Sequence, residues 1–233
     1  MPEPTTDALA RAAIEEVRAG MVVGLGSGRA AARAIAGLAR RARDEKLDLR
    51  CVATSRASAI QAEDLGLRLV ALEDAGRVNL LFDGADEVDP ALRMINGKGG
   101  AMTLEKQVAR AAARRLYLIQ AAKLVGALGE TTALPVEVQP EDIDLVAATL
   151  GKLGLEPAVR RGDGDAPVLT DAGNPIVDAR LPRGSHAVDL EALGAALDLM
   201  PGVVGHGLFL DEADVVLIED AEGHVTRRAR PGR

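Results

Sequence analysis

Cysteine and aromatic residues are scarce in this sequence. Cys51 is the only cysteine among 233 residues, so an internal disulfide is excluded and a reducing compartment is expected. It lies within an expected strand, which favours a buried apolar role over that of a nucleophile. Tryptophan is absent, and one tyrosine and two phenylalanines leave few rings to stack on nucleic-acid bases. The formal net charge of −7 also argues against a nucleic-acid-binding protein, because affinity for duplex phosphates rests on clustered basic residues.

Long hydrophobic runs are missing as well. Although 48% of the residues are hydrophobic, glycine or a charged residue interrupts the apolar runs well short of the roughly 20 residues that span a bilayer. The opening segment MPEPTTDALARAAIEE is acidic and amphipathic, unlike the basic and then apolar pattern of a signal peptide. We therefore expect a cytoplasmic protein without a membrane partner.

The first half of the chain alternates between helix-like and strand-like patterns, which is typical of a parallel sheet with crossover helices. The expected helices cover residues 7–18, 29–43, 57–65 and 103–115. The expected strands cover residues 21–26, 49–55, 67–72, 79–86 and 116–122. This half of the sequence therefore predicts an open α/β sheet.

The second half has a different order of elements. Its expected strands cover residues 134–139, 156–161, 175–180 and 203–210, and its expected helices cover 143–154 and 189–200. This β-α-β-β-α-β order is that of a ferredoxin-like unit. Turn residues also indicate a hairpin between 168–170 and 176–178.

The run DVVLIED at 214–220 is expected to form a further strand that rejoins the first sheet, and the basic segment RRARPGR after it is interpreted as a solvated terminus. We therefore predict a larger α/β domain made of residues 1–127 plus 203–233. A smaller α+β domain at 128–202 is inserted into it.

Glycines gather directly after the first expected strand, in Gly24-Leu25-Gly26-Ser27-Gly28-Arg29. Glycine lets the backbone approach an anion closely, and the helix that follows presents unpaired N–H groups and the positive end of its dipole. A phosphate site is the natural interpretation, and a tight turn without a ligand is the alternative. A dinucleotide site is disfavoured, because residues 30–32 are all alanine and the next strand ends without an acidic residue for a ribose.

Four carboxylates stand within seven residues in Asp83-Gly84-Ala85-Asp86-Glu87-Val88-Asp89. They follow an apolar run, at the carboxyl end of an expected strand, which is where open parallel sheets bind ligands. A carboxylate pair there is suited to hold sugar hydroxyls or to transfer protons. Two alternatives remain, a solvated acidic turn and an oxygen cage for a metal ion. The three histidines are scattered and give the metal interpretation no support, and His206, flanked by glycines, is interpreted as structural.

A second glycine-rich loop, Asn96-Gly97-Lys98-Gly99-Gly100, runs into a helix whose first turn carries Glu105. Acidic residues commonly stabilise the first turn of a helix, and this is the simpler interpretation. A carboxylate there, with backbone N–H donors from 97–100 nearby, is also suited to abstract a proton next to a carbonyl group. Together the three segments are far more specific than any one of them.

These segments make the sequence resemble the ribose-5-phosphate isomerase A family. The resemblance runs through VVGLGSG (22–28), ATSRAS (53–58), FDGADEVD (82–89), KGGAMTLEK (98–106), LPVEV (134–138), PGVVGHGLF (201–209) and ADVVLI (213–218). It covers nearly the whole chain. It implies a Rossmann-like main domain with a ferredoxin-like inserted domain, and the interconversion of ribose 5-phosphate and ribulose 5-phosphate without metal or cofactor. It also implies a cytoplasmic homodimer or homotetramer.

The resemblance assigns roles to individual positions. Glu105 matches the catalytic base, and Asp83 and Asp86 match carboxylates associated with ring opening and hydroxyl binding. The substrate-binding positions that it implies are Gly26, Ser27, Gly28, Arg29, Ala30, Gly84, Ala85, Asn96, Gly97, Lys98, Gly99 and Lys123.

Several positions depart from the family pattern. Arg29 and Ala30 replace a pair of small hydroxyl residues, Asn96 replaces a lysine, with Lys98 two residues further on, and Gln120 replaces an acidic residue. A guanidinium binds phosphate bidentately, so Arg29 is suited to compensate for the missing hydroxyls. The departures leave two alternatives open: an isomerase for another sugar or sugar phosphate, and a sugar-phosphate-binding protein with impaired catalysis.

Overall fold

The computed structural model of the protein describes residues 7–182 and 188–230. The chain divides into two compact units. The first unit comprises Met1–Ala85, Leu104–Lys123 and Glu212–Arg233, and the second comprises Asp86–Thr103 and Leu124–Asp211. The predicted domain boundaries differ from this division, because they placed 86–103, 124–127 and 203–211 with the larger domain.

A six-stranded sheet forms the centre of the first unit, with the order β13-β12-β6-β3-β1-β2. Its strands are β1 (Val22–Leu25), β2 (Arg50–Ala53), β3 (Leu80–Gly84), β6 (Arg115–Gln120), β12 (Val215–Glu219) and β13 (Val225–Ala229). The pairs from β2 to β12 are parallel, and β13 pairs with β12 in antiparallel fashion. The return of 214–220 to the first sheet is therefore confirmed.

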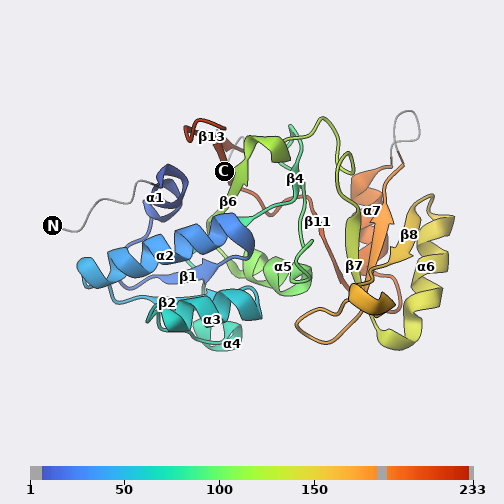
Figure 1. Ribbon diagram of the computed structural model, residues 1–233, viewed down its shortest axis with the longest axis horizontal. Helices are drawn as coiled ribbons and strands as arrows, with labels where there is room; N and C mark the ends of the chain where they lie inside the picture. Colours follow the sequence, from blue (N-terminus) through green and yellow to red (C-terminus); the bar gives the residue numbers. More distant parts are fainter. Residues whose placement is uncertain (1–6, 183–187, 231–233) are drawn as a thin grey trace. The chain divides into compact units, whose positions relative to one another are not determined.

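Helices cover both faces of this sheet. Helix α2 (Gly28–Asp44) buries Ala31, Ala34, Ile35 and Leu38, the spacing of one helical stripe, and lies beside α1 (Ala8–Ile14) (Figure 1). These residues share a core with alternate strand residues such as Val23 and Leu25. Gly24, between them, faces the other way, where a Cβ atom would lie 3.0 Å from Cγ1 of Val108 on α5 (Met102–Ala111). Because successive strand residues point to opposite faces, α2 and α5 cover opposite faces of the sheet.

The order of the strands defines one place where the chain changes direction across the sheet. After β1 the chain crosses through α2 to β2 on one side, and after β3 it crosses through α5 to β6 on the other. The order 2-1-3 followed by later strands is the flavodoxin-like arrangement, which binds ligands beside the carboxyl ends of the first and third strands. The glycine turn after β1 and the aspartate at the end of β3 flank that point.

The second unit contains two antiparallel sheets. Its four-stranded sheet has the order β10-β7-β9-β8, with the chain order β7 (Leu134–Val138), α6 (Ile143–Lys152), β8 (Glu156–Val159), β9 (Ile176–Arg180), α7 (Leu190–Asp198) and β10 (Val203–His206). Its three-stranded sheet joins β4 (Glu87–Val88), β5 (Met94–Ile95) and β11 (Leu208–Phe209). The predicted fold class, an α/β parallel sheet with a separate ferredoxin-like α+β domain, is confirmed.

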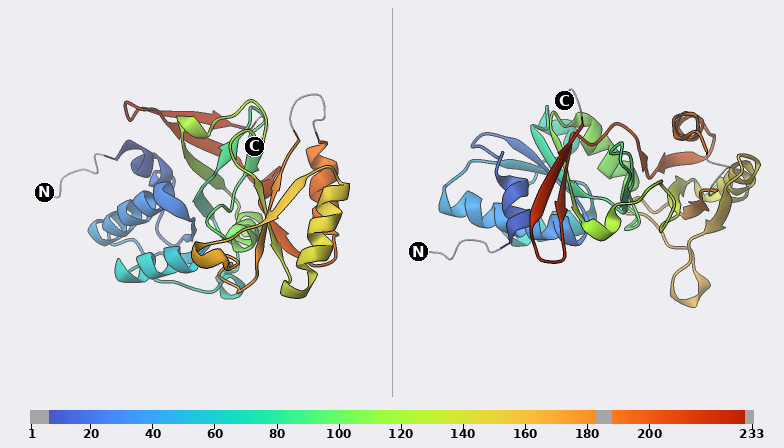
Figure 2. Two further views of the ribbon diagram at one scale, coloured as in Figure 1. Left: turned by 45° about the vertical axis from the view of Figure 1, so that its right-hand side comes forward. Right: turned by 90° about the horizontal axis from the view of Figure 1, so that it is seen from above.

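Three local predictions need correction. Residues 67–72 do not form a strand, because only Leu69 makes an isolated bridge, to Cys51, and α4 (Leu72–Ala75) follows. The segment 168–170 likewise makes only a bridge, between Leu169 and Pro175, while β9 pairs with β7 and β8 instead. The basic end of the chain is not simply a solvated terminus: Val225–Ala229 forms edge strand β13, which is the dark-red hairpin with β12 in Figure 2.

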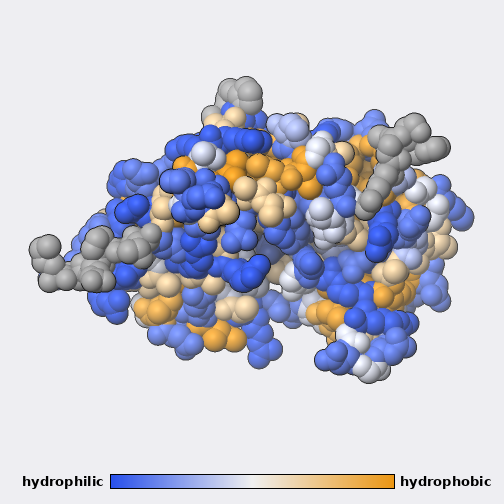
Figure 3. Space-filling model, turned by 45° about the horizontal axis from the view of Figure 1, so that its top comes forward, coloured by the Kyte–Doolittle hydropathy of each residue, from blue (hydrophilic) through white to orange (hydrophobic). Residues whose placement is uncertain are grey.

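Within the described residues, no helix combines the length and hydrophobicity needed to cross a bilayer. The face shown in Figure 3 is mainly hydrophilic, with separate hydrophobic patches. Several large apolar side chains are exposed, among them those of Leu145, Leu153 and Leu199 in the second unit.

Candidate active site

The glycine turn after β1 is built around Asp83. The backbone N–H of Ser27 donates to Oδ1 of Asp83 at 2.7 Å, and the N–H of Gly26 donates to the carbonyl of Phe82 at 2.8 Å. A Cβ atom on Gly26 would lie 2.2 Å from Oδ1 of Asp83 and 2.3 Å from its Cα. Glycine is therefore required at position 26, because the turn after β1 presses directly against the end of β3.

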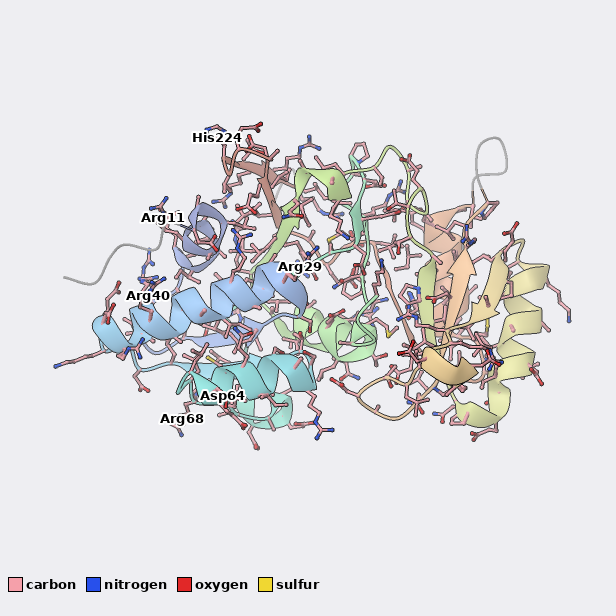
Figure 4. The ribbon with its side chains drawn as sticks, viewed as in Figure 1. Arg11, Arg29, Arg40, Asp64, Arg68 and His224 are labelled. Carbon is pink, nitrogen blue, oxygen red and sulfur yellow. The ribbon has the colours of Figure 1, made fainter. Side chains whose placement is uncertain are left out.

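Helix α2 begins at this turn with its first N–H groups available to an anion. Ser27 precedes the helix, but its hydroxyl bonds to Oγ1 of the buried Thr54 at 2.9 Å and does not cap the helix. Gly28 has a φ of +82°, which favours glycine, and the first turn carries no acidic residue. Arg29 is exposed in that first turn, where it is labelled in Figure 4. This combination of free donors, positive dipole end and guanidinium is suited to a phosphate group.

Glu105 and Asp83 both lie near the phenol of Tyr117. Asp83, Glu105 and Tyr117 are 1%, 3% and 0% exposed, respectively. Burial raises the pKa of Tyr117 well above its usual range, and the negative charges of Asp83, Glu212 and Glu105 raise it further. Tyr117 therefore remains protonated among three carboxylates. The first unit thus brings the proposed base and the aspartate of the phosphate turn around one buried side chain.

The four carboxylates of the segment 83–89 have separate partners. Asp83 holds the turn at Ser27, and Oδ2 of Asp86 accepts the N–H of Lys98 at 2.8 Å. Glu87 is fully buried and accepts hydrogen bonds from the backbone of 129, 131 and 132. Asp89 pairs with Arg93 at 2.7 Å. The interpretation as a solvated acidic turn is therefore wrong, because each carboxylate organises a different part of the chain.

A metal cage at these aspartates is disfavoured by the same geometry. Among the residues that the structure describes, the exposed side chains of Asp220, Glu222 and His224 form one group whose potential ligand atoms lie within 4.8 Å of one another. Asp83, Asp86 and Asp89 do not form such a group in that part of the chain.

The second glycine-rich loop belongs to the second unit. Its backbone is held on both sides of Lys98, because Asp86 accepts the Lys98 N–H and Nη1 of Arg160 donates to the Lys98 carbonyl at 2.7 Å. Gly97 and Gly100 have φ values of +99° and +83°. A Cβ on Gly97 would lie 2.4 Å from Cβ of Met102, so this glycine is needed for space as well as for its backbone conformation. Lys98 and Gly99 are exposed, whereas Asn96 is buried.

The remaining predicted positions lie at the carboxyl edge of the parallel sheet. Gly84 ends β3, and Lys123 ends a short helical turn, Ala121–Lys123, directly after β6. Ala30 and Ala85 are partly buried. The first unit therefore groups Gly26, Ser27, Gly28, Asp83 and Gly84, with Glu105 close to the same tyrosine. The second unit groups Asp86 with the loop 96–99.

Sequence reasoning missed three residues of the first group, namely Thr54, Tyr117 and Glu212. The block ATSRAS after the second strand was the available signal for Thr54, because the carboxyl end of β2 adjoins that of β1. Tyr117 and Glu212 belong to no sequence motif that would have indicated a role in the site.

The interpretations of Cys51 and His206 as structural agree with their surroundings. Cys51 is buried, and desolvation raises the pKa of its thiol to about 12, so it is a poor nucleophile. Nδ1 of His206 accepts the N–H of Leu208 at 3.2 Å, and its Nε2 lies 3.1 Å from Oδ1 of Asp198.

Comparison of the sequence with known families and proteins gives one consistent result. The profile of the family described as ribose 5-phosphate isomerase A (phosphoriboisomerase A) matches residues 50–223. Ribose-5-phosphate isomerase A of Roseiflexus sp. is 42% identical over 222 residues, which cover 95% of this chain and 94% of the relative. The protein of the same name from Gloeobacter violaceus is 45% identical over 217 residues, which cover 92% and 91%.

Solved structures agree with the sequence comparison. Ribose 5-phosphate isomerase A from Methanocaldococcus jannaschii superimposes with a TM-score of 0.89 at 36% identity, covering 95% of this chain and 96% of the other. A D-ribose-5-phosphate isomerase in complex with phospho-erythronic acid gives a TM-score of 0.90 at 32% identity, with the same coverage. By its sequence and by its fold, this chain belongs to the ribose 5-phosphate isomerase A family.

Proposed function

We propose that this protein interconverts D-ribose 5-phosphate and D-ribulose 5-phosphate through an enediolate intermediate. The observation that carries the proposal lies in the first unit, where Asp83 both shapes an anion-binding turn and shares the surroundings of Tyr117 with Glu105. Relatives that match nearly the whole chain are ribose-5-phosphate isomerases, and one of them is seen with a phosphorylated sugar acid. Both lines of support point to proton transfer on a sugar phosphate.

Glu105 is the proposed base. In its ionised form it removes the proton from C2 of the open-chain aldose, and in its protonated form it returns a proton to C1. The hydroxyl proton passes from O2 to O1 at the enediolate stage, and the product is the ketose. A carboxylate base in a site largely shielded from water can perform both steps, as in the enediolate chemistry of triosephosphate isomerase. Asp83 and Asp86 are proposed to hold hydroxyl groups and to assist opening of the sugar ring.

The developing charge on the carbonyl oxygen needs hydrogen-bond donors. Within the loop 97–100, the backbone N–H groups of Gly97 and Gly99 are proposed to supply them, with the side chain of Asn96 or Lys98. The N–H of Lys98 already donates to Asp86, and that of Gly100 donates to the carbonyl of Gly97. Asn96 offers an amide donor without charge, so Lys98 is the proposed cation of this loop. The backbone of Lys98 is already held by Asp86 and Arg160, which limits the positions that its side chain can reach.

The phosphate group is proposed to bind at the start of α2. Gly26 and Ser27 shape the turn with their own N–H groups, and the N–H groups of Gly28 and of the first turn of α2 are the proposed backbone donors. Arg29 offers a guanidinium, and Lys123 offers a second cation at the same edge of the sheet. Ala30, Gly84, Ala85 and Gly99 are proposed to line the substrate. The proposed reaction requires only proton transfers, and no cofactor takes part in it.

Purified protein should be assayed directly for conversion of ribose 5-phosphate to ribulose 5-phosphate, alongside ribose and four-carbon sugar phosphates. We expect the highest kcat/KM with ribose 5-phosphate. A clear preference for another substrate would instead identify an isomerase of different specificity, the alternative favoured by Asn96 and Arg29. Binding without proton exchange at C2 in deuterated water would identify a binding protein with impaired catalysis.

We also propose that the protein acts in the cytoplasm as a homodimer or homotetramer. The single buried cysteine is compatible with a reducing compartment, and oligomers are expected from the family resemblance. Light scattering coupled to size-exclusion chromatography should give a mass of two or four chains, and a monomer would contradict the proposal.

A further inference from the structure

One face of the four-stranded sheet in the second unit carries a buried carboxylate. Along β7, Leu134, Val136 and Val138 pack with the apolar residues of α6 and α7. Glu137 lies between them on the strand and therefore points to the opposite face, away from these helices. Its side chain is only 2% exposed. A charge in such a position is costly unless several hydrogen bonds compensate for the loss of water.

Three uncharged side chains donate to Glu137. Oε1 accepts from the hydroxyl of Thr170 and from the amide of Asn174, each at 2.8 Å. Oε2 accepts from the hydroxyl of Thr103. Thr170 and Asn174 belong to one turn of the second unit, whereas Thr103 is the second residue of α5, two residues before Glu105. Glu137 therefore joins its sheet to the beginning of the helix that carries the proposed base.

The neighbouring strand leaves room for this contact. Gly205 on β10 is directly paired with Glu137 on β7. A Cβ atom on Gly205 would lie 2.2 Å from Oγ1 of Thr103, so the threonine occupies the space that any other residue at 205 would fill. Gly207 has the same effect at the other end of the segment, because its Cβ would lie 2.0 Å from the carbonyl oxygen of Asn96. The two glycines of the motif VVGHGLF thus accommodate both ends of the segment 96–103.

We propose that Glu137 is a positioning residue for the isomerisation, acting through Thr103 to fix the first turn of α5 and with it the carboxylate of Glu105. This inference rests on the proposed function, in which Glu105 is the base. In this role Glu137 affects the reaction only through Thr103. Its negative charge also lies at the amino end of a helix, where a carboxylate is favoured by the helix dipole.

A matched pair of variants tests the proposal. Thr103→Val keeps the shape of the side chain and removes its hydroxyl, whereas Thr103→Ser keeps the hydroxyl. Because a displacement of about 1 Å at a reacting group can cost about 100-fold, we expect Thr103→Val to lower kcat by about 10- to 100-fold with little change in KM. We expect Thr103→Ser to restore most of the rate. Thr170→Val removes a different bond to Glu137 and should leave kcat close to that of the wild type.

Amide hydrogen exchange of the peptide that contains the first turns of α5 provides a readout independent of turnover. Exchange there should be faster in Thr103→Val than in the wild type and close to normal in Thr103→Ser. If Thr103→Val does not fold, Gly205→Ala displaces the same hydroxyl and should give the same loss of kcat and of protection.

The possible failures are distinguishable. An inactive wild-type protein, or full activity in Glu105→Gln, contradicts the proposed function. An active wild type in which Thr103→Val or Gly205→Ala keeps both normal kcat and normal exchange contradicts the positioning role alone. Equal losses in Thr103→Val and Thr170→Val contradict it too, because they indicate a general effect on the stability of the second unit.

Discussion

The two glycine-rich loops occupy similar places between a strand and a helix, but different residues hold their backbones. Each follows a strand, leads into a helix, and gives a backbone N–H to an aspartate of the segment 83–89: Ser27 to Asp83 in the first unit and Lys98 to Asp86 in the second. The first loop is held chiefly by the neighbouring parallel strand. The second is held by Asp86, which directly precedes β4, and by Arg160, which directly follows β8.

This difference predicts that the two loops bind different parts of the substrate. The first loop ends in an open helix N-terminus with an arginine, which suits a phosphate that does not change during the reaction. The second loop presents an exposed lysine and leads within a few residues to Glu105, which suits the reacting end of the sugar. Variants of the first loop should therefore change KM, and variants of the second loop and its helix should change kcat.

The largest expected effect is that of Glu105→Gln. Loss of a general base typically costs about 10²- to 10⁴-fold, so kcat should fall within this range while a phosphorylated substrate analogue still binds. Steady-state turnover and calorimetric titration of the analogue measure the two quantities. Gln107→Ala, an exposed position on the same helix, is the matched control. Normal turnover in Glu105→Gln would show that another group is the base.

Lys98→Gln tests the second loop. If Lys98 supplies the positive charge for the enediolate oxygen, kcat should fall by about 10²- to 10³-fold, the usual cost of losing one such donor. KM should change much less. Lys152→Gln, on the exposed surface of α6, serves as the control and should behave as the wild type. A rise in KM at constant kcat would assign Lys98 to binding and would remove the proposed division between the loops.

Arg29→Gln tests the first loop. A hydrogen bond to a charged group contributes about 1.5–3 kcal/mol, so KM for ribose 5-phosphate should rise by about 10- to 100-fold with kcat nearly unchanged. Arg43→Gln, exposed near the other end of the same helix, should have no effect. Steady-state kinetics over a range of substrate concentrations separates the two parameters. Equal KM values in Arg29→Gln and the wild type would place the phosphate elsewhere.

Gly26→Ala and Gly28→Ala test two different reasons for glycine in the first loop. The first tests the close contact with Asp83, and the second tests the left-handed backbone conformation. The added methyl group at position 26 would collide with Asp83, so we expect a loss of about 1–3 kcal/mol or more in the free energy of unfolding. At position 28 there is open space but a φ of +82°, so the expected loss is only about 1–2 kcal/mol. Urea unfolding monitored by circular dichroism measures both. The reverse order would mean that Asp83 does not constrain the turn.

The smallest expected effect concerns pH and Tyr117. Its pKa is raised in the folded protein, so above about pH 10 the unfolded chain loses a proton that the native state keeps. The contribution of Tyr117 to the free energy of unfolding is therefore fully present at neutral pH and declines as the pH rises past about 10. Tyr117→Phe should lose less stability than the wild type between about pH 8 and pH 10.5, as measured by urea unfolding. Parallel losses in the two proteins would argue that the tyrosine does not titrate differently on folding.

Much of the fold followed from periodicity and order. The alternation in the first half predicted the parallel strands, and the β-α-β-β-α-β order predicted the four-stranded sheet of the second unit. The segment 86–103 was harder to assign, since β4 and β5 are two residues long and β5 pairs with β11, more than a hundred residues away in the chain. Strands this short carry too few residues for an alternating pattern to appear.

For the candidate site, the sequence likewise indicated some residues but not the partners that surround them. Glycine before a helix and carboxylates after a strand are local signals, so Gly26, Asp83 and Glu105 could be proposed as site residues from the sequence. The partners of those residues are not local. Tyr117 lies on a strand whose pattern is simply apolar, and Glu137 occupies one position of an ordinary alternating strand.

By itself the sequence determined the order of the elements, the two glycine-rich turns and the presence of four carboxylates between them, because each depends on neighbouring residues in the chain. Only the tertiary structure decided that Asp83 shapes one loop, that Asp86 holds the other, and that Glu137 reaches the start of α5 through Thr103. The physical reason is that a carboxylate in a folded protein takes its role from whichever donors the fold brings to it, and those donors here lie up to tens of residues away.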